Sequence, residues 1–180
     1  MQRIIIIGSG GAGKSTLARQ LGADLSIPVH HLDQLYWKPG WVESAPQEFA
    51  AKQQAILGEP SWVIDGNFGT TMELRLRAAD TILFLDLPTA VCLWGAIRRY
   101  LKYRNRTRPD MTEGNPEKLD WDYLWWILSY RSVRRPAVMA RLKKLGAEKK
   151  VTVLRSRAAV DEFRKSLKPG EPQPRLLPEA

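Results

Sequence analysis

The sequence predicts an α/β fold with a five-stranded, mostly parallel sheet and helices on both faces. Three observations favour it. The run Ile4–Ile7 is β-branched and uninterrupted, which is typical of a strand covered on both sides. A glycine-rich segment and an amphipathic helical pattern follow this run directly. Further apolar runs then alternate with helical patterns along the 180 residues, as in a doubly wound sheet.

The glycine-rich segment after the first strand fits the pattern GxxxxGK[ST]. Its residues are Gly8, Ser9, Gly10, Gly11, Ala12, Gly13, Lys14 and Ser15, and Thr16 follows. Such glycines let successive backbone N–H groups point at phosphate oxygens, and the helix dipole adds attraction. We expect Lys14 to contact the β- and γ-phosphates of ATP and Ser15 to ligate Mg²⁺. A turn without a ligand is the alternative, but the full motif between a buried strand and a helix indicates a nucleotide-binding P-loop.

The remaining elements follow in alternation. We predict strands at 27–33, 61–65, 81–86 and 149–155, and helices at 15–21, 44–57, 71–79, 88–103, 121–146 and 156–167. Ser44 is expected to be the N-cap of its helix, with Pro46 in the first turn. Pro136 is expected to kink or split the helix that contains it. The segment 104–120 has two prolines and no hydrophobic period, which indicates a mobile loop.

Length and composition favour one domain. Residues 1–168 can bury a substantial core, whereas the proline-rich tail 169–180 is expected to be disordered. Cys92 is the one cysteine, so no intrachain disulfide forms, and a reducing, cytoplasmic location is expected. No apolar run approaches the roughly 20 residues that span a bilayer, and the early first strand leaves no room for a signal peptide.

The net charge of +9 raises the question of a polyanionic partner such as DNA. Two segments carry most of it: Arg98, Arg99, Lys102, Arg104, Arg106 and Arg108, and Arg131, Arg134, Arg135, Arg141, Lys143, Lys144, Lys149 and Lys150. Arginine suits bidentate phosphate contacts, so the first segment indicates phosphate binding and the second favours a solvated helix face. A solvated face is also the alternative for the first segment. No helix-turn-helix, zinc or aromatic-interleaved nucleic-acid motif is found in the sequence.

Ligands of doubly wound sheets collect at the carboxyl ends of the strands. Asp33 ends the second predicted strand, where it could accept a proton from a substrate hydroxyl, or serve only as a loop or capping residue. Asp65 and Asp86 end the next two, and either could hold Mg²⁺. The cleaner apolar run before Asp86 favours Asp86. The adjacent His30 and His31 point to opposite faces of a strand, which disfavours a metal site there.

Three tryptophans open the helical pattern after the loop. Trp121, Trp125 and Trp126 could stack a base. With Leu124 and Leu128, however, they form a stripe at helical spacing, and this favours packing.

Several segments together resemble a known family. They are IIIIGSGGAGKSTLARQLG, HLDQLYWKPGW, WVIDGNF, RLRAADTILFLDLP, YRNRTRPDM, PEKLDWDYLWWI and VLRSRAAVDEF. In order and spacing, over residues 3 to about 167, they resemble bacterial "DNA topology modulation" proteins, which are P-loop proteins related to adenylate kinase. The resemblance implies a nucleoside-monophosphate-kinase-like fold with an acceptor-binding region at 33–60, an arginine-bearing lid at 104–120 and an adenine loop at 155–158, which includes Arg155 and Ser156.

The resemblance also changes the expected roles of single residues. WVIDGNF is similar to the Asp-Gly motif of those kinases, which makes Asp65 the magnesium residue and Asp86 a structural one. Arg99 matches the second of two expected helix arginines, but Gly95 stands where the first is expected. Asp33 matches the aspartate that shikimate-type kinases use on a hydroxyl acceptor, whereas the Phe-Pro-Arg continuation of adenylate kinases is missing after DGNF.

The function expected from the sequence is transfer of the γ-phosphoryl group of Mg·ATP to a small acceptor. The expected catalytic residues are Lys14, Asp33, Arg99, Arg104 and Arg108, and the expected metal residues are Ser15 and Asp65. Two alternatives stay open at this point: a DNA-associated regulator that uses ATP as a switch, and a nucleotide-binding protein without turnover.

Overall fold

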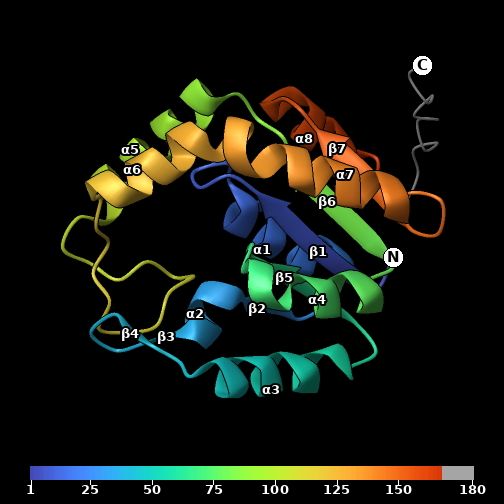
Figure 1. The fold of residues 1–180 in the computed structure, drawn as a ribbon, viewed down its shortest axis with the longest axis horizontal. Coiled ribbons are helices and arrows are strands. Elements are labelled where there is room, and N and C mark those ends of the chain that lie inside the picture. Colours follow the sequence, from blue (N-terminus) through green and yellow to red (C-terminus); the bar gives the residue numbers. More distant parts are fainter. Residues whose placement is uncertain (168–180) are drawn as a thin grey trace.

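Five parallel strands form the central sheet, in the order β2-β5-β1-β6-β7 (Figure 1). The structure is a computed structural model that describes residues 1–167. The strands are β1 (Arg3–Gly8), β2 (Val29–His31), β5 (Trp62–Asp65), β6 (Thr81–Leu85) and β7 (Lys150–Leu154). The register places Ile6 of β1 opposite Asp65 on one side and Leu83 on the other. The predicted fold class is therefore confirmed, and the strand that ends in Asp65 lies beside the P-loop strand. The tail 169–180, which we expected to be disordered, lies outside the described residues.

Helices cover both faces of this sheet (Figure 1). They are α1 (Lys14–Leu25), α2 (Leu32–Tyr36), α3 (Pro46–Leu57), α4 (Met72–Ala78), α5 (Thr89–Tyr103), α6 (Trp121–Ser129), α7 (Arg135–Leu145) and α8 (Arg157–Lys165), with short helical turns η1 (Gly69–Thr71) and η2 (Tyr130–Arg134). None of the helices among residues 1–167 is long and apolar enough to cross a membrane.

Side chains of β1 point alternately to the two faces of the sheet, so the core has two layers. Ile4 and Ile6 pack with residues of α1, α5, α6 and α8 on one face. Ile5 and Ile7 pack with residues of α2, α3, α4, η2 and α7 on the other. A strand buried on both faces explains the uninterrupted isoleucine run, because no position of β1 from Ile4 onward faces solvent.

The segment after β2 differs from the prediction. The strand ends at His31, and Asp33 lies in the first turn of the short helix α2 rather than at a strand end. A two-stranded antiparallel hairpin, β3 (Trp37–Lys38) and β4 (Val42–Glu43), then precedes α3. The expected N-cap role of Ser44 is wrong. Its buried hydroxyl donates to the Leu35 carbonyl oxygen at 3.3 Å, and α3 begins after Ala45 without a side-chain cap.

Residues 104–120 form a loop without helix or strand, as predicted, but this loop is packed against its neighbours. The yellow chain at the left of Figure 1 reaches the β3–β4 hairpin. Asn115 is buried there, accepts from the Trp41 backbone N–H at 2.7 Å and donates to the Lys38 carbonyl oxygen at 3.0 Å. The predicted lid therefore contacts the predicted acceptor-binding region directly.

The long C-terminal helical segment is split where Pro136 predicts. α6 passes into the π-helical turn η2, and α7 starts one residue before the proline. The packing interpretation of the tryptophan stripe is right for Trp126 only, which contacts both core layers. It is wrong for Trp121 and Trp125, which are 79% and 69% exposed, because α6 buries the opposite side of its surface through Ile127.

Candidate active site

The P-loop connects the end of β1 to the start of α1. Gly8, Gly11 and Gly13 have φ values of 147°, 70° and 91°, which side chains rarely allow. Gly10, Ala12 and Thr16 complete the predicted loop, and Ala12 is fully buried in the core. The Gly8 end is held by Asn67, which accepts from the Gly8 N–H at 3.1 Å and donates to its carbonyl oxygen at 2.8 Å. Asn67 thus ties the start of the P-loop to the end of β5.

Lys14 stands at the end of this loop. Its ammonium group donates to the Gly8 and Ser9 carbonyl oxygens at 3.1 and 2.9 Å. Burial lowers the pKa of Lys14 below its ordinary value, although Asp65 and Asp33 act in the opposite direction. The Lys14 side chain is half-buried and lines the site, and an anion placed beside its ammonium group would stabilise the protonated form.

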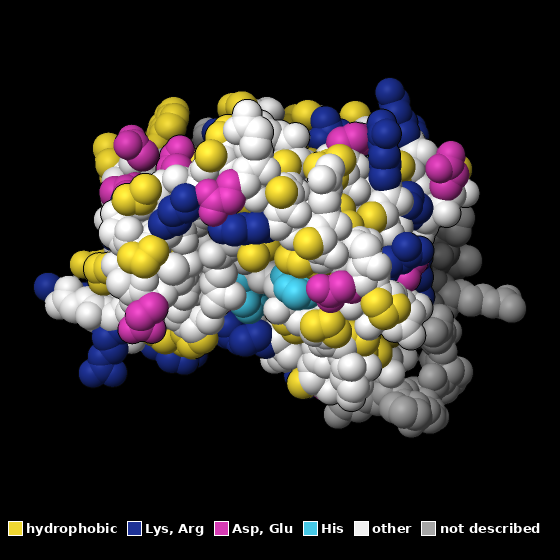
Figure 2. All heavy atoms as spheres, turned by 90° about the horizontal axis from the view of Figure 1, so that it is seen from below, with side chains coloured by type: hydrophobic (Ala, Val, Ile, Leu, Met, Phe, Trp, Pro, Cys, Tyr) yellow, Lys and Arg dark blue, Asp and Glu magenta, His cyan; other side chains and the backbone are white. Residues whose placement is uncertain are grey.

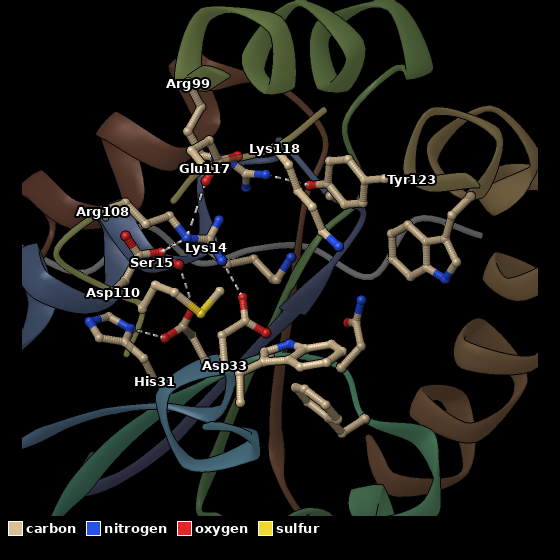
Figure 3. Close-up of a pocket in the computed structure, with 18 of the residues that line it drawn as sticks. Lys14, Ser15, His31, Asp33, Arg99, Arg108, Asp110, Glu117, Lys118 and Tyr123 are labelled. Carbon is tan, nitrogen blue, oxygen red and sulfur yellow. Dashed lines mark hydrogen bonds and ion pairs between the residues drawn. The ribbon is translucent and has the colours of Figure 1, made fainter. Parts of the chain in front are cut away.

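Ser15 and Asp65 meet between α1 and the end of β5. The Ser15 hydroxyl donates to Asp65 Oδ2 at 2.7 Å, and the other carboxylate oxygen pairs with His31 Nδ1 (Figure 3). Asp65 is held from two sides. A hydroxyl and a carboxylate are hard oxygen donors of the kind Mg²⁺ prefers, and magnesium needs few protein ligands when a substrate supplies phosphates. Among residues 1–167 there is no cluster of three or more His, Cys, Asp or Glu arranged to hold a metal. The pair therefore fits magnesium held together with a nucleotide.

Asp86, the other carboxylate considered for magnesium, is bound by arginine side chains. Arg135 binds it through two hydrogen bonds of 2.7 Å, and Arg131 lies 4.0 Å away. This places Asp86 between β6 and the start of α7.

Asp33 projects from α2 toward the lid loop. Arg108 Nη2 lies 2.5 Å from Asp33 Oδ2, and Asp110 and Glu117 lie 3.6 Å from Arg108 Nε (Figure 3). Arg108 is buried although it comes from a loop. Burial tends to raise the pKa of Asp110, but opposing interactions, of which the charge of Arg108 is the largest, hold it below its ordinary value.

Arg99 reaches the same region from α5. Its guanidinium donates to Glu117 at 2.7 Å and to the Tyr123 hydroxyl at 3.1 Å. Burial would lower the pKa of Arg99, but Tyr123 and Glu117 outweigh it and raise the pKa. Arg99 therefore stays charged, and Glu117 links it to Arg108.

Two cavities meet at the P-loop. The first, of about 540 Å³, is lined by Lys14, Ser15, Asp33, Asp65, Arg99 and Arg108, among others. The second, of about 680 Å³, runs along the other side of the loop beside Thr16, Trp94, Arg98, Arg99 and Arg157. Lys14, Ser15, Arg99 and Asp110 line both. The two cavities have the arrangement expected for an acceptor and a nucleotide that meet at a phosphate.

Five predicted site residues do not line either cavity: Gly8, Ala12, Arg104, Arg155 and Ser156. Arg104 is exposed at the end of α5, and its backbone bridges to Glu117. Arg155 is exposed after β7, and the Ser156 hydroxyl accepts from the Ala159 N–H at 3.1 Å as the N-cap of α8. From this loop it is Arg157 that contacts the P-loop, with donation to the Ala12 carbonyl oxygen at 2.7 Å.

Sequence reasoning missed several side chains that line the cavities. They are Trp37, Trp41, Phe68, Trp94, Asp110, Glu117 and Tyr123. The aromatic residues between 36 and 41 were the available signal, since aromatic side chains clustered in a turn-rich segment are unusual. Glu117 and Tyr123 carried no signal, because their roles arise from contacts across the fold.

Comparison with known proteins agrees with this architecture. No family model matches the chain, and no curated protein matches it. Among solved structures, the fold is that of P-loop kinases. The shikimate kinase from Acinetobacter baumannii in complex with shikimate is similar with a TM-score of 0.60 and 13% identity, over 93% of this chain and 90% of that one. The shikimate kinase from Bacteroides thetaiotaomicron gives a TM-score of 0.51 and 18% identity, over 92% and 95% of the two chains. The chain thus has a shikimate-kinase-like fold.

Proposed function

We propose that this protein transfers the γ-phosphoryl group of Mg·ATP to a hydroxyl group of a small acceptor. The observation that carries the proposal is that the P-loop lysine, the Ser15–Asp65 pair and Asp33 all line one cavity. The likeness to shikimate kinases, one of them solved with shikimate, supports a hydroxyl acceptor. The resemblance of the sequence to adenylate-kinase-related P-loop proteins supports ATP as the donor.

The P-loop backbone and Lys14 would hold the ATP phosphates, and Ser15 and Asp65 would hold Mg²⁺. Bound there, Mg²⁺ would neutralise charge on the β- and γ-phosphate oxygens. Asp33 would orient the acceptor hydroxyl and take its proton. As the acceptor oxygen bonds to the γ-phosphorus, the bond from that phosphorus to the β,γ-bridging oxygen breaks and ADP leaves. Arg99 and Arg108 would stabilise the charge on the moving phosphoryl group, and Arg104 would join them on closure of the lid.

The test is ADP production from Mg·ATP across a panel of nucleosides, nucleotides, sugars and small hydroxy acids. We expect at least one acceptor to raise ADP release well above the rate with water alone. Lys14→Ala should remove this activity with the fold intact by circular dichroism. Asp33→Asn should lower kcat or raise the KM of the acceptor. Wild-type rates in Lys14→Ala would overturn the proposal.

A DNA-associated regulator is the second candidate, and the basic surface favours it. Arg131, Arg141, Lys143, Lys144 and Lys150 are exposed on η2, α7 and β7. On the face where α3 lies, by contrast, acidic and basic side chains are interspersed (Figure 2). Affinity for duplex DNA that survives moderate salt and changes with ATP would support this candidate. Binding that disappears with salt would reflect charge alone.

A further inference from the structure

The cavity that contains Asp33 has more carboxylates than cations. Six carboxylates line it: Asp33, Asp65, Asp110, Glu117, Asp120 and Asp122. Four cationic side chains do so: Lys14, Arg99, Arg108 and Lys118. Lys14 and Asp65 belong to the proposed sites for ATP and magnesium. The wall that remains for an acceptor is therefore net negative.

Each cation on this remaining wall already has an acidic partner. Arg99 binds Glu117 at 2.7 Å, and Arg108 binds Asp33 at 2.5 Å. Lys118 Nζ lies 3.9 Å from Asp120 and 4.6 Å from the centre of the Trp41 ring. A carboxylate or phosphate on the acceptor would have to displace one of these partners and leave a carboxylate unpaired, which is costly where the pair is buried.

Binding of ATP would make the acceptor side of the cavity disfavour anions more strongly. Arg99 and Arg108 are the side chains proposed to turn toward the phosphates. Asp33, Asp110 and Glu117 would then lose part of their compensation, and the acceptor side would become more negative.

The same cavity has an apolar side. Trp37, Trp41, Phe68, Met111 and Trp126 line it. The rings of Trp37 and Trp41 pack edge to face at 5.4 Å. Aromatic faces favour ring systems and cations over anions, because the face of the ring carries partial negative charge.

We infer that the acceptor is an uncharged or cationic alcohol with a ring or other apolar face, and that the cavity discriminates against anionic acceptors. This inference rests on the proposed phosphoryl transfer. The inferred acceptor differs in charge from a hydroxy acid or a nucleotide, both of which are anionic.

The experiment compares acceptors that differ in charge at one group. Suitable pairs are methyl shikimate and shikimate, a hexose and its uronic acid, and thymidine and its 5′-monophosphate. Binding is measured by calorimetry with Mg²⁺ and a non-hydrolysable ATP analogue, and turnover by ADP release with ATP. We expect the uncharged member to have at least about tenfold higher affinity or kcat/KM, which corresponds to roughly 1.4 kcal/mol.

Binding of the ATP analogue is measured first. Its absence would overturn the proposed function, and the inference with it. With the analogue bound, equal or tighter binding of the anionic members would overturn the inference alone. Failure of every uncharged member to bind would also overturn the inference.

A charge-reversal variant tests whether the cavity itself causes the preference. Asp122 lines the cavity and is exposed, so Asp122→Lys should fold normally. We expect the preference for the uncharged member to fall about threefold, as for a solvent-screened charge. Glu113→Lys is the control for charge, because Glu113 is exposed in the loop before α6 and lines neither cavity. An equal shift in both variants would assign the preference to net charge and overturn the role of the cavity.

Discussion

Gly95 of α5 lies directly against the backbone of Gly11 in the P-loop. A Cβ atom on Gly95 would lie 2.2 Å from the Gly11 carbonyl oxygen, and one on Gly11 would lie 2.0 Å from the Cys92 carbonyl oxygen. Helix and loop therefore pack backbone against backbone. This contact explains why glycine stands at position 95, where the resemblance to adenylate-kinase relatives leads one to expect arginine.

Gly95→Ala should displace the P-loop. Alanine normally stabilises a helix relative to glycine by about 1 kcal/mol, but a clash with backbone outweighs that gain. We expect a net loss of about 1–3 kcal/mol in the free energy of unfolding and weaker ATP binding, measured by urea denaturation and calorimetry. Gly69→Ala is the control, since a Cβ there meets nothing within 4 Å. Unchanged ATP affinity in Gly95→Ala would contradict the role of this contact.

Asp65 and Asp86 should respond differently to the same substitution. Asp65→Asn weakens the proposed magnesium site, so we expect ADP production to require much more Mg²⁺, in addition to any loss of stability from the weakened contacts with Ser15 and His31. Asp86→Asn instead weakens the two hydrogen bonds to Arg135 and should destabilise the fold by about 1–3 kcal/mol. Magnesium titrations and urea denaturation of both variants separate the effects. A raised Mg²⁺ requirement in Asp86→Asn and not in Asp65→Asn would instead make Asp86 the metal residue.

Arg99→Ala should lower kcat by about 10³-fold, the usual effect of removing an arginine that stabilises a moving phosphoryl group. The variant also leaves Glu117 with less compensation, so its melting temperature is measured alongside. Arg77→Ala is a control deletion of an arginine that is exposed on α4, and for it we expect wild-type turnover. Retention of activity in Arg99→Ala would remove Arg99 from the mechanism.

Asp80 should make stability depend on acid pH. Burial tends to raise the pKa of this carboxyl, but hydrogen bonds from the Thr81 hydroxyl and the Gln2 and Arg3 N–H groups lower it overall. A lowered folded-state pKa stabilises the fold above the ordinary pKa of aspartate, and this is lost as the pH falls through the folded-state value. We expect wild type to exceed Asp80→Asn by about 1 kcal/mol at neutral pH. The difference should fade below about pH 4. A difference that grows in acid would contradict this assignment.

The sequence was sufficient for features that depend on local pattern. The isoleucine run, the glycine motif and the alternation of strands and helices predict the sheet and its P-loop. Pro136 marks the helix boundary correctly, and the last helix begins one residue after the predicted start at Ser156. In each case a short stretch of chain contains the physical cause.

Features that arise from contacts between distant segments could not be predicted in this way. The exposed Trp121 and Trp125 have the spacing of a buried stripe, but α6 turns another side to the core. Asp33 is placed by a one-turn helix whose brevity leaves no periodic signal. The pairing of Arg108 with Asp33 joins residues 75 positions apart.

That pairing sets an expected order of events. While Arg108 is paired with the Asp33 carboxylate, Asp33 is not available as a general base for an incoming alcohol. A triphosphate that draws Arg108 away would release Asp33, so nucleotide arrival is coupled to activation of the second substrate. The lid loop would thereby favour a compulsory-order kinetic scheme with ATP leading.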